Sequence, residues 1–155
     1  MNIFLRNLKD SDTNILLKTE NDESIWPYSI QDKPFERGTI KNYIKNASAQ
    51  TVKKAKQKRF VISSDDINVI GFIDVFKYDA NKLKAFVGII ILDEYRQKGF
   101  GYDSIQLLEY YCLNQIGINK LCASIDSNNI KSIKLFSKSG FVKKNNELYE
   151  KILNE

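Results

Sequence analysis

The 155-residue sequence predicts a mixed α+β fold built on a largely antiparallel sheet with one parallel crossover. Three strand-like runs follow one another across short, turn-rich connections, which is the pattern of an antiparallel meander. A helical segment then separates two further strands, and a strand, a helix and a strand in series permit one parallel pair. The length and the 43% share of hydrophobic residues suit a single packed domain over residues 1–155.

The first third of the chain is predicted to hold one strand and two helices. Ile3–Arg6 has the pattern of a short strand, and Asp10–Asp12 offers helix-capping side chains before the next hydrophobic residues. From Ile40 to Ala47, hydrophobic residues recur at spacings of three and four, which indicates an amphipathic helix. The segment between these helices, from Asn21 to Phe35, holds both prolines and the single tryptophan, so we expect a loop there.

The rest of the chain supplies the other strands and two more helices, so that about four helices are expected to flank the sheet. Each of these two helices carries hydrophobic residues on one face. Leu121, Ala123 and Ile125 alternate along the sequence as they would in a half-buried strand. Strands are predicted at Arg59–Ser63, Val69–Phe76, Lys84–Leu92 and Leu121–Ile125, with Phe141–Val142 and Leu148–Ile152 closing the sheet, and helices at Gly99–Gln115 and Asn129–Ser139.

Composition excludes several classes of function. The chain has no histidine, so a histidine base, a Ser-His pair and a histidine metal ligand are all excluded. Cys112 and Cys122 lie in hydrophobic runs without the spacing of a metal or redox motif, so we expect buried, reduced thiols and no metal site. No run resembles a signal peptide or a membrane span, and the expected location is therefore the cytoplasm, without a membrane partner.

The net charge of +5 favours ligands that bear phosphate groups. Much of this charge comes from the run Lys53–Arg59. Nucleic-acid binding by such a run requires interleaved aromatic residues or a known binding module, and neither is present. We therefore expect a solvated loop or helix end, and no nucleic-acid partner.

The most informative segment is a hydrophobic strand, Ile89–Leu92, that leads through a polar turn into a helix starting near Gly99. The first amides of a helix lack partners within the helix, and its dipole makes this end positive. Glycines let a phosphate approach these amides closely, so the segment suits a diphosphate, although a simple tight turn explains it equally well. A dinucleotide-binding fingerprint is disfavoured because Ser104 stands where its third glycine would be.

A second motif follows the next strand at Asn129–Phe141. It matches N-x-x-[A/S]-x-x-[L/I]-[Y/F]-x-x-x-G-F, and Arg96–Gly101 matches Q/R-x-x-G-x-G/A. With these two motifs in this order, the sequence resembles the GNAT superfamily of N-acetyltransferases, most strongly from about Val69 onward. The residues Gly99–Asp103 look most like the branch that acetylates ribosomal-protein N-termini and polyamines such as spermidine.

The resemblance implies a GNAT-type sheet in which acetyl-CoA, the cosubstrate, inserts between two splayed parallel strands. Backbone groups of the first strand would bind the pantetheine arm and polarise the thioester carbonyl, as an oxyanion hole does. Amides of the glycine turn would hold the pyrophosphate. The implied acetyl-CoA contacts are Ile89, Ile91, Arg96, Gln97, Lys98, Gly99, Phe100, Gly101, Tyr102, Asn129, Ser132 and Phe136.

The same resemblance implies direct attack of an amine on the thioester, so the enzyme must deprotonate an amine whose pKa is near 10.4. The sequence departs from the family here, because Phe136 stands where many relatives have a tyrosine acid and Phe86 where many have a glutamate. Asp74 matches an acidic position of the polyamine-acetylating relatives and is our first candidate for base or amine binding, with an ordinary strand residue as the alternative. Tyr149 and Glu94 are secondary candidates.

We therefore expect an N-acetyltransferase acting on a primary amine (a protein N-terminus, a polyamine or a small molecule), as a monomer or homodimer. The alternative is a non-catalytic acyl-CoA-binding regulatory module, which the two phenylalanines favour. In the family the acceptor pocket is built from the first two helices and their loop, where Asp22, Glu23, Trp26 and Tyr28 could receive a cationic amine beside an aromatic wall. An ordinary loop anchored by the tryptophan is the other interpretation, and the basic net charge argues against a highly cationic acceptor.

Overall fold

The structure, a computed structural model, describes residues 2–22 and 35–154. The chain divides into two compact units, one formed by Met1–Arg6 with Thr51–Glu155 and the other by Asn7–Gln50. The expectation of one domain over residues 1–155 stays a prediction.

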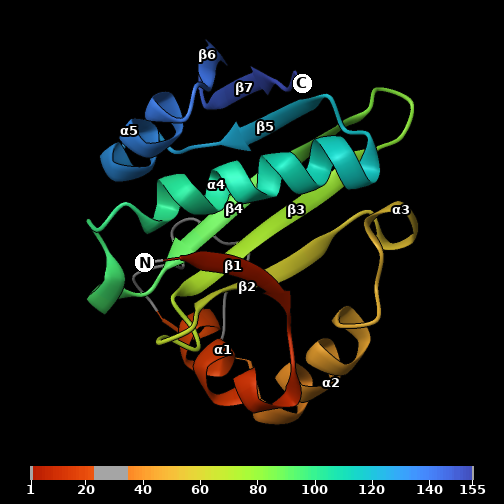
Figure 1. The fold of residues 1–155 in the computed structure, drawn as a ribbon, viewed down its shortest axis with the longest axis vertical. Helices are drawn as coiled ribbons and strands as arrows, with labels where there is room; N and C mark the ends of the chain where they lie inside the picture. Colours follow the sequence, from red (N-terminus) through yellow and green to blue (C-terminus); the bar gives the residue numbers. More distant parts are fainter. Residues whose placement is uncertain (1, 23–34, 155) are drawn as a thin grey trace. The chain divides into compact units, whose positions relative to one another are not determined.

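The larger unit contains a seven-stranded sheet in the order β1-β2-β3-β4-β5-β7-β6 (Figure 1). Its strands are β1 (Ile3–Asn7), β2 (Lys58–Ser64), β3 (Gly71–Asp79), β4 (Lys84–Ile91), β5 (Lys120–Ser124), β6 (Val142–Asn145) and β7 (Leu148–Ile152). The pairs β2–β3, β3–β4, β5–β7 and β6–β7 are antiparallel, whereas β4 and β5 run parallel. This confirms the predicted mixed fold with one parallel pair.

Within residues 2–22 and 35–154 five α-helices accompany the strands, one more than the number expected. The larger unit holds α3 (Val52–Ala55), α4 (Phe100–Tyr111) and α5 (Ile130–Lys138), and the smaller unit holds α1 (Thr13–Glu20) and α2 (Arg37–Ala47). The predicted helix over Gly99–Gln115 is two elements, because α4 gives way to a π-helical turn at Cys112–Ile116. None of the helices within residues 2–22 and 35–154 is long and apolar enough to cross a membrane.

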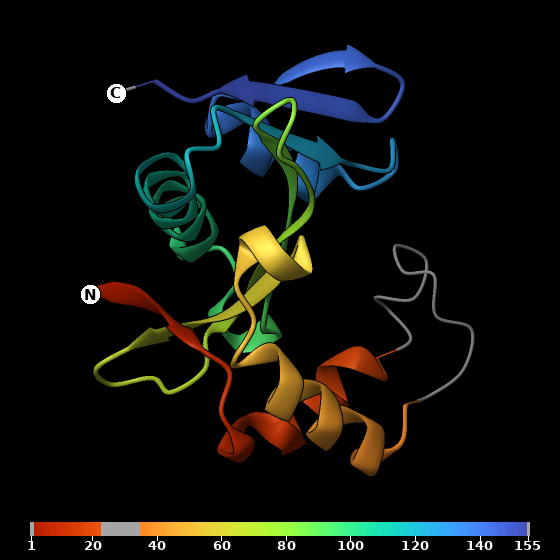
Figure 2. The ribbon, with the colours of Figure 1, turned by 90° about the vertical axis from the view of Figure 1, so that its right-hand side faces the viewer.

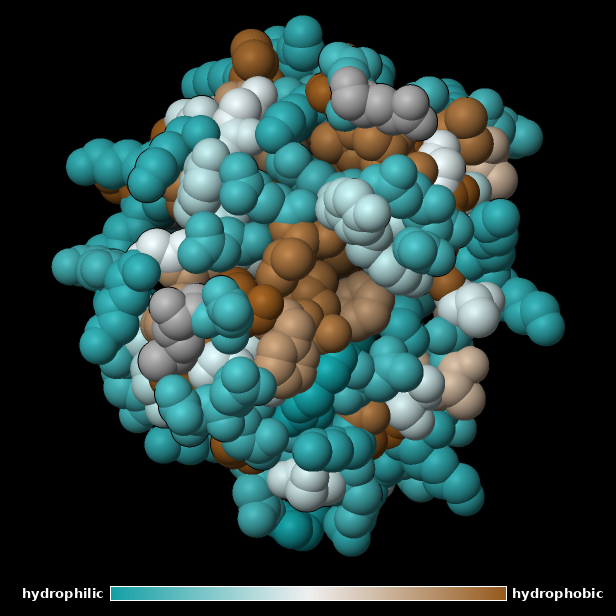
Figure 3. All heavy atoms as spheres, viewed as in Figure 1, coloured by the Kyte–Doolittle hydropathy of each residue, from teal (hydrophilic) through white to brown (hydrophobic). Residues whose placement is uncertain are grey.

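The core of the larger unit lies between the sheet and α4, which crosses one face of it (Figure 2). Ile105 and Leu108 of α4 form a buried stripe that Cys112 of the following π-helical turn continues, as the periodicity predicts. Hydrophobic side chains also gather at the centre of this face beside α4 (Figure 3). Cys112 and Cys122 are buried free thiols, as predicted.

The parallel pair is short. Only Lys84–Phe86 of β4 pair with β5, whereas β3 pairs with β4 as far as Ile91. Beyond Phe86 the two parallel strands diverge, as the ribbons in Figures 1 and 2 show. The backbone of β4 from Val87 to Ile91 is thus left without a strand on its β5 side, and this splay is the feature that the family resemblance implies.

The basic run Lys53–Arg59 covers the end of α3 and the start of β2. Lys53, Lys54 and Lys56 are exposed, and Lys56 has the left-handed φ of 63° that ends α3. The run is therefore a solvated helix end, as predicted, apart from its last two residues, Lys58 and Arg59, which begin β2 and are half-buried.

Candidate active site

The glycine turn connects the end of β4 to the start of α4. A 3-10 turn at Asp93–Tyr95 follows β4, and the chain then reaches Gly99, whose φ of 85° and ψ of 0° precede the helix. A φ in this range strains residues with a Cβ, so the glycine suits the turn. No side chain caps α4, and its first amides therefore remain available to an anion.

Of the two basic side chains of the turn, Arg96 is bonded within the protein and Lys98 is exposed. The Arg96 Nε donates to the Ile91 carbonyl at 2.9 Å, and its guanidinium pairs with Asp93 at 2.7 Å. Arg96 thus ties the turn to the end of β4. Gln97, with a φ of 60°, and Lys98 are exposed beside it, and among the described residues Lys98 has no ion-pair partner. Lys98 is therefore the turn's cation best placed to meet a phosphate.

The splay of β4 and β5 lies directly before this turn. Ile89 and Ile91 pack their side chains against the core, so only their backbone groups could meet a ligand in the opening, and the Ile91 carbonyl already accepts a hydrogen bond from Arg96. Gly101, in the first turn of α4, lies so close to α5 that an added Cβ would be 3.0 Å from Leu135 Cδ2. An open strand edge that leads to uncapped helix amides matches the two parts of acetyl-CoA that need binding, the pantetheine arm and the pyrophosphate.

The second motif forms the start and the buried face of α5. The Asn129 Oδ1 accepts a hydrogen bond from the Ser132 amide at 3.3 Å, which caps the helix. Within the described residues the Asn129 side-chain nitrogen makes no hydrogen bond, so it can still donate to a ligand. Phe136 is buried and packs edge-to-face on Phe141, with ring centroids 5.0 Å apart. Phe136 therefore belongs to the core that backs this region.

Asp74, the first catalytic candidate, is paired. Its two carboxylate oxygens accept hydrogen bonds from Arg59 Nε and Nη2 at 2.7 and 2.8 Å. In the register of β3 and β4 it lies opposite Gly88, within the part of β4 that β5 does not cover. Its neighbours Ile73 and Val75 point into the core, so Asp74 points to the opposite face of the sheet.

The other two catalytic candidates are not brought together with Asp74. Tyr149 is buried on β7, pairs with Ala123, and belongs to the core on the α4 side of the sheet. Asp74 and Tyr149 therefore lie on opposite faces. Glu94 is exposed in the 3-10 turn after β4. The three residues do not form one cluster.

Of the expected acceptor residues, only Asp22 is described; Glu23, Trp26 and Tyr28 lie outside the described residues. Asp22 is half-buried, and its amide donates to the Thr19 carbonyl at 3.2 Å just after α1. Asn21 accepts from the Phe35 amide at 2.7 Å and donates to its carbonyl at 3.0 Å. This double hydrogen bond holds residues 21 and 35 of the smaller unit together.

Sequence reasoning missed Arg59, which it assigned to the solvated basic run. The short connection between β2 and β3 could have indicated that Arg59 faces Asp74, because a hairpin with few connecting residues pairs the strand positions on either side of its turn. The contacts of Glu150 on β7 were also not predicted. Its carboxylate oxygen Oε2 lies 3.9 Å from the Lys120 ammonium and 3.7 Å from the Cys122 sulfur. Burial, followed by the charge of Glu150, raises the pKa of the Cys122 thiol, so this cysteine stays protonated at neutral pH.

Comparison with known proteins identifies the family. Residues 2–142 match the family model described as an acetyltransferase (GNAT) domain. Two relatives named spermidine N(1)-acetyltransferase, from Vibrio cholerae and Escherichia coli, are each 23% identical to this chain over 152 residues. These alignments cover 98% of this chain, and 86% and 79% of the respective relatives.

A solved structure is similar over the same length. It is a crystal structure of spermidine N-acetyltransferase from Vibrio cholerae in complex with CoA and spermine, 20% identical in sequence. The match covers 97% of this chain and 95% of that chain with a TM-score of 0.84, which confirms the fold. The family model spans the chain from β1 to α5 and ends at the first residue of β6. The chain therefore belongs to the GNAT family of acetyltransferases, which confirms the predicted enzyme class and its acetyl-CoA cosubstrate.

Proposed function

We propose that this enzyme acetylates a primary amine of a polyamine such as spermidine. The observation that carries the proposal is the match of 98% of the chain to two spermidine N(1)-acetyltransferases. The match of 97% of this chain to the structure containing CoA and spermine supports it. A protein N-terminus and a small-molecule amine remain the competing acceptors.

The residues proposed to hold acetyl-CoA lie along one continuous path. The β4 backbone at Ile89 and Ile91 would bind the pantetheine arm, and the Asn129 side chain would donate to it from the start of α5. The uncapped amides from Gly99 to Tyr102 would hold the pyrophosphate, with Lys98 adding positive charge. When bound there, acetyl-CoA supplies an activated acetyl group as a thioester.

Asp74 is proposed to handle the acceptor amine. It lies opposite Gly88, a β4 residue without a side chain on that face of the sheet. Attack by the amine nitrogen forms the amide bond, breaks the carbon–sulfur bond and releases one amine proton, which the Asp74 carboxylate would accept directly or through a water. Arg59 would hold the carboxylate in place through its two hydrogen bonds. The proton that the departing thiolate needs would come from water, because Phe136 cannot supply one.

The distribution of charge supports both ligands. The larger unit carries 18 lysines and arginines against 12 acidic residues, whereas the smaller unit carries six against seven. A net positive unit suits the phosphates of acetyl-CoA. The excess positive charge that argued against a cationic acceptor therefore resides in the larger unit, whereas the smaller unit is close to neutral.

An acetyl-transfer assay tests the proposal. Release of CoA thiol is measured with spermidine, spermine, peptides with free N-termini and aminoglycosides, and the products are identified by mass spectrometry. Acetyl-CoA is compared with longer acyl-CoAs, since the sequence leaves the acyl length open. We expect the highest kcat/KM with acetyl-CoA and a polyamine.

Each other outcome decides against the proposal. Faster turnover of peptides would move the acceptor to protein N-termini. Acetyl-CoA binding without transfer to any amine would restore the alternative of a non-catalytic regulatory module.

Two further expectations also stay predictions. One related structure is described as a dodecameric spermidine N-acetyltransferase from Vibrio cholerae, with a TM-score of 0.75. Our expectation for this chain is a monomer or homodimer, which sedimentation velocity would test. The cytoplasmic location likewise awaits cell fractionation.

A further inference from the structure

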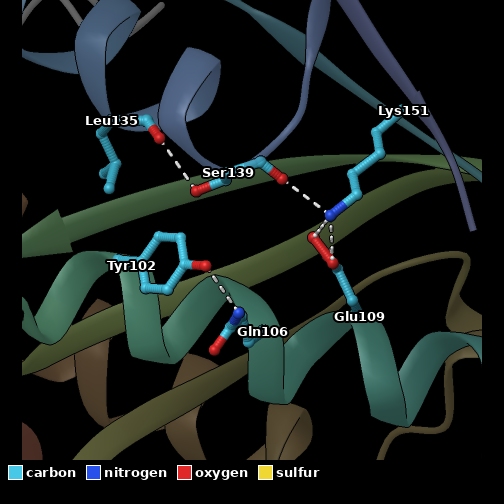
Figure 4. Close-up of polar contacts among 6 residues, drawn as sticks. All are labelled: Tyr102, Gln106, Glu109, Leu135, Ser139 and Lys151. Atoms are coloured by element: carbon cyan, nitrogen blue, oxygen red, sulfur yellow. Dashed lines mark hydrogen bonds and ion pairs between the residues drawn. The ribbon is translucent and has the colours of Figure 1, made fainter.

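Lys151 of β7 joins two helices that are separate in the sequence. Its ammonium donates to Glu109 Oε1 and Oε2 of α4 at 2.8 and 2.9 Å, and to the Ser139 carbonyl at the end of α5 at 2.7 Å (Figure 4). The side chains of Lys151 and Glu109 are 27% and 13% exposed. A lysine ammonium has three N–H donors, and here the three acceptors all belong to the protein.

A glycine at the end of α5 leaves room for the Lys151 side chain. Gly140, with a φ of 97°, follows Ser139, and an added Cβ there would lie 3.2 Å from Lys151 Cε. A glycine thus both ends the helix and leaves room for the lysine. Ser139 is buried, and its hydroxyl donates to the Leu135 carbonyl at 2.8 Å. The lysine consequently holds the last turn of α5 at a fixed position relative to β7.

The same two helices meet again at the glycine turn. Leu135 of α5 packs on Gly101, and the Lys138 ammonium lies 5.0 Å from the centroid of the Tyr102 ring. The Tyr102 hydroxyl in turn accepts a hydrogen bond from Gln106 at 2.9 Å (Figure 4). The first turn of α4 is therefore positioned by α5, and α5 is positioned by Lys151.

We propose that Lys151, through Glu109, is a positioning residue for the acetyl-CoA site. The inference rests on the proposed site, in which α4 supplies the phosphate-binding amides and α5 supplies Asn129. Lys151 touches neither part. It sets the spacing between the two helices, and it therefore controls affinity for the cosubstrate more than the rate of acetyl transfer.

If Lys151 acted only through its positive charge, the expected effects of substitutions would differ from those of a positioning role. A substitution at Glu109 distinguishes the two explanations. Long-range attraction of the CoA phosphates weakens when a lysine is removed but strengthens when a glutamate is removed. Positioning requires both partners, so the loss of either one should weaken binding. Glu109→Gln is therefore the decisive variant, and it is also mild, because the amide keeps one acceptor for the lysine.

The experiment measures the Kd for acetyl-CoA by isothermal titration calorimetry, together with KM and kcat, in Lys151→Met and Glu109→Gln. Lys120→Met is the matched control, since it removes the same charge and an ion pair within the sheet without touching α4 or α5. Thermal melts establish that each variant is folded at the assay temperature. We expect Kd and KM to rise roughly tenfold in both variants, because small shifts of positioning groups have effects of this size or larger, while kcat changes less than about twofold.

The outcomes separate this inference from the proposed function. A wild-type protein that binds no acetyl-CoA would overturn the site itself. If the wild type binds but Glu109→Gln binds equally well or more tightly, charge alone suffices and the positioning role is wrong. If Lys120→Met weakens binding as much as Lys151→Met does, the lysine has no specific role. A double variant carrying both substitutions should be no weaker than the worse single one, because both remove the same contact.

Discussion

Arg59 and Asp74 form a two-point ion pair across β2 and β3, with hydrogen bonds of 2.7 and 2.8 Å between guanidinium and carboxylate. The pair is half-buried, with side chains 16% and 26% exposed. It lies opposite the portion of β4 that β5 leaves open. A planar pair of this kind fixes the direction of the carboxylate, which is what either a base or an amine-binding group requires.

The first prediction concerns this carboxylate. Asp74→Ala is expected to lower kcat by roughly 10²- to 10⁴-fold if Asp74 accepts the proton, the usual contribution of a positioned base. If Asp74 instead binds the amine, the KM for the amine rises and kcat changes less. The Kd for acetyl-CoA should stay unchanged in either case, and steady-state kinetics with calorimetry measures all three quantities.

Glu150→Ala is the matched control for Asp74→Ala. It alters another half-buried carboxylate that is paired with a basic residue, on β7 rather than β3. A normal kcat and normal amine KM in Asp74→Ala would show that its ion pair with Arg59 is purely structural.

Local patterns in the sequence predicted the elements and the two motifs, because periodicity and glycine placement are properties of neighbouring residues. Every predicted strand is present, and Gly99 lies at the helix start as expected. Asp74 was identified, but its partner was not. Which residue faces Asp74 depends on the register of β2 against β3, and a shift of one residue would place Arg59 on the other face.

Long-range contacts were the part that local patterns could not supply. Lys151 and Glu109 are 42 residues apart, and their contact exists only once β7, α4 and α5 are packed. The boundary between α4 and the π-helical turn at Cys112 also escaped prediction, because both conformations continue the same hydrophobic stripe. Contacts between distant elements and the exact end of α4 depend on how the elements pack, and no single segment of the sequence determines that packing.

A second prediction concerns the close approach of β3 to β4 at Gly71. An added Cβ at this position would lie 2.1 Å from the Ile90 carbonyl oxygen, which is backbone and cannot turn aside. Gly71→Ala should therefore displace β4 and lower the free energy of unfolding by about 1–3 kcal/mol, the usual cost of overpacking. Urea unfolding measures this change, and displacement of β4 should also weaken acetyl-CoA binding.

Gly88→Ala is the control for Gly71→Ala, since its added Cβ would lie 3.5 Å from Phe76 Cε1, an ordinary contact. The two variants make the same chemical change on adjacent strands. Equal losses of stability in both would contradict the steric explanation.

The third prediction concerns the backbone of the glycine turn. Gly99 has a φ of 85°, and apart from its chain neighbours no atom of the described residues lies within 4 Å of an added Cβ, so a substitution there meets conformational strain and no clash. Gly99→Val should weaken acetyl-CoA binding, because a β-branched residue resists this region and the amides of α4 would shift. Gly99→Asn should bind more tightly than Gly99→Val, since asparagine tolerates left-handed φ. Calorimetric Kd values that follow side-chain size alone would argue against backbone strain.

The last prediction concerns pH and the buried thiol of Cys112. Burial, followed by the charge of Glu109, raises the pKa of this thiol from 9.0 to about 12. Between these two values the unfolded chain loses a proton that the folded protein keeps. The thiol's contribution to stability is therefore fully present below pH 9 and is lost as the pH rises towards 12, by up to about 1.4 kcal/mol per pH unit.

Urea unfolding at pH 8 and at pH 10.5 tests this dependence. Wild-type protein should lose more stability between the two values than Cys112→Ala, which has no thiol to titrate. The substitution also leaves a small cavity, but that cost is the same at both pH values and cancels in the comparison. An identical loss in the two proteins would mean that Cys112 ionises as readily in the folded state as in the unfolded state, in conflict with its complete burial against α4 and the sheet.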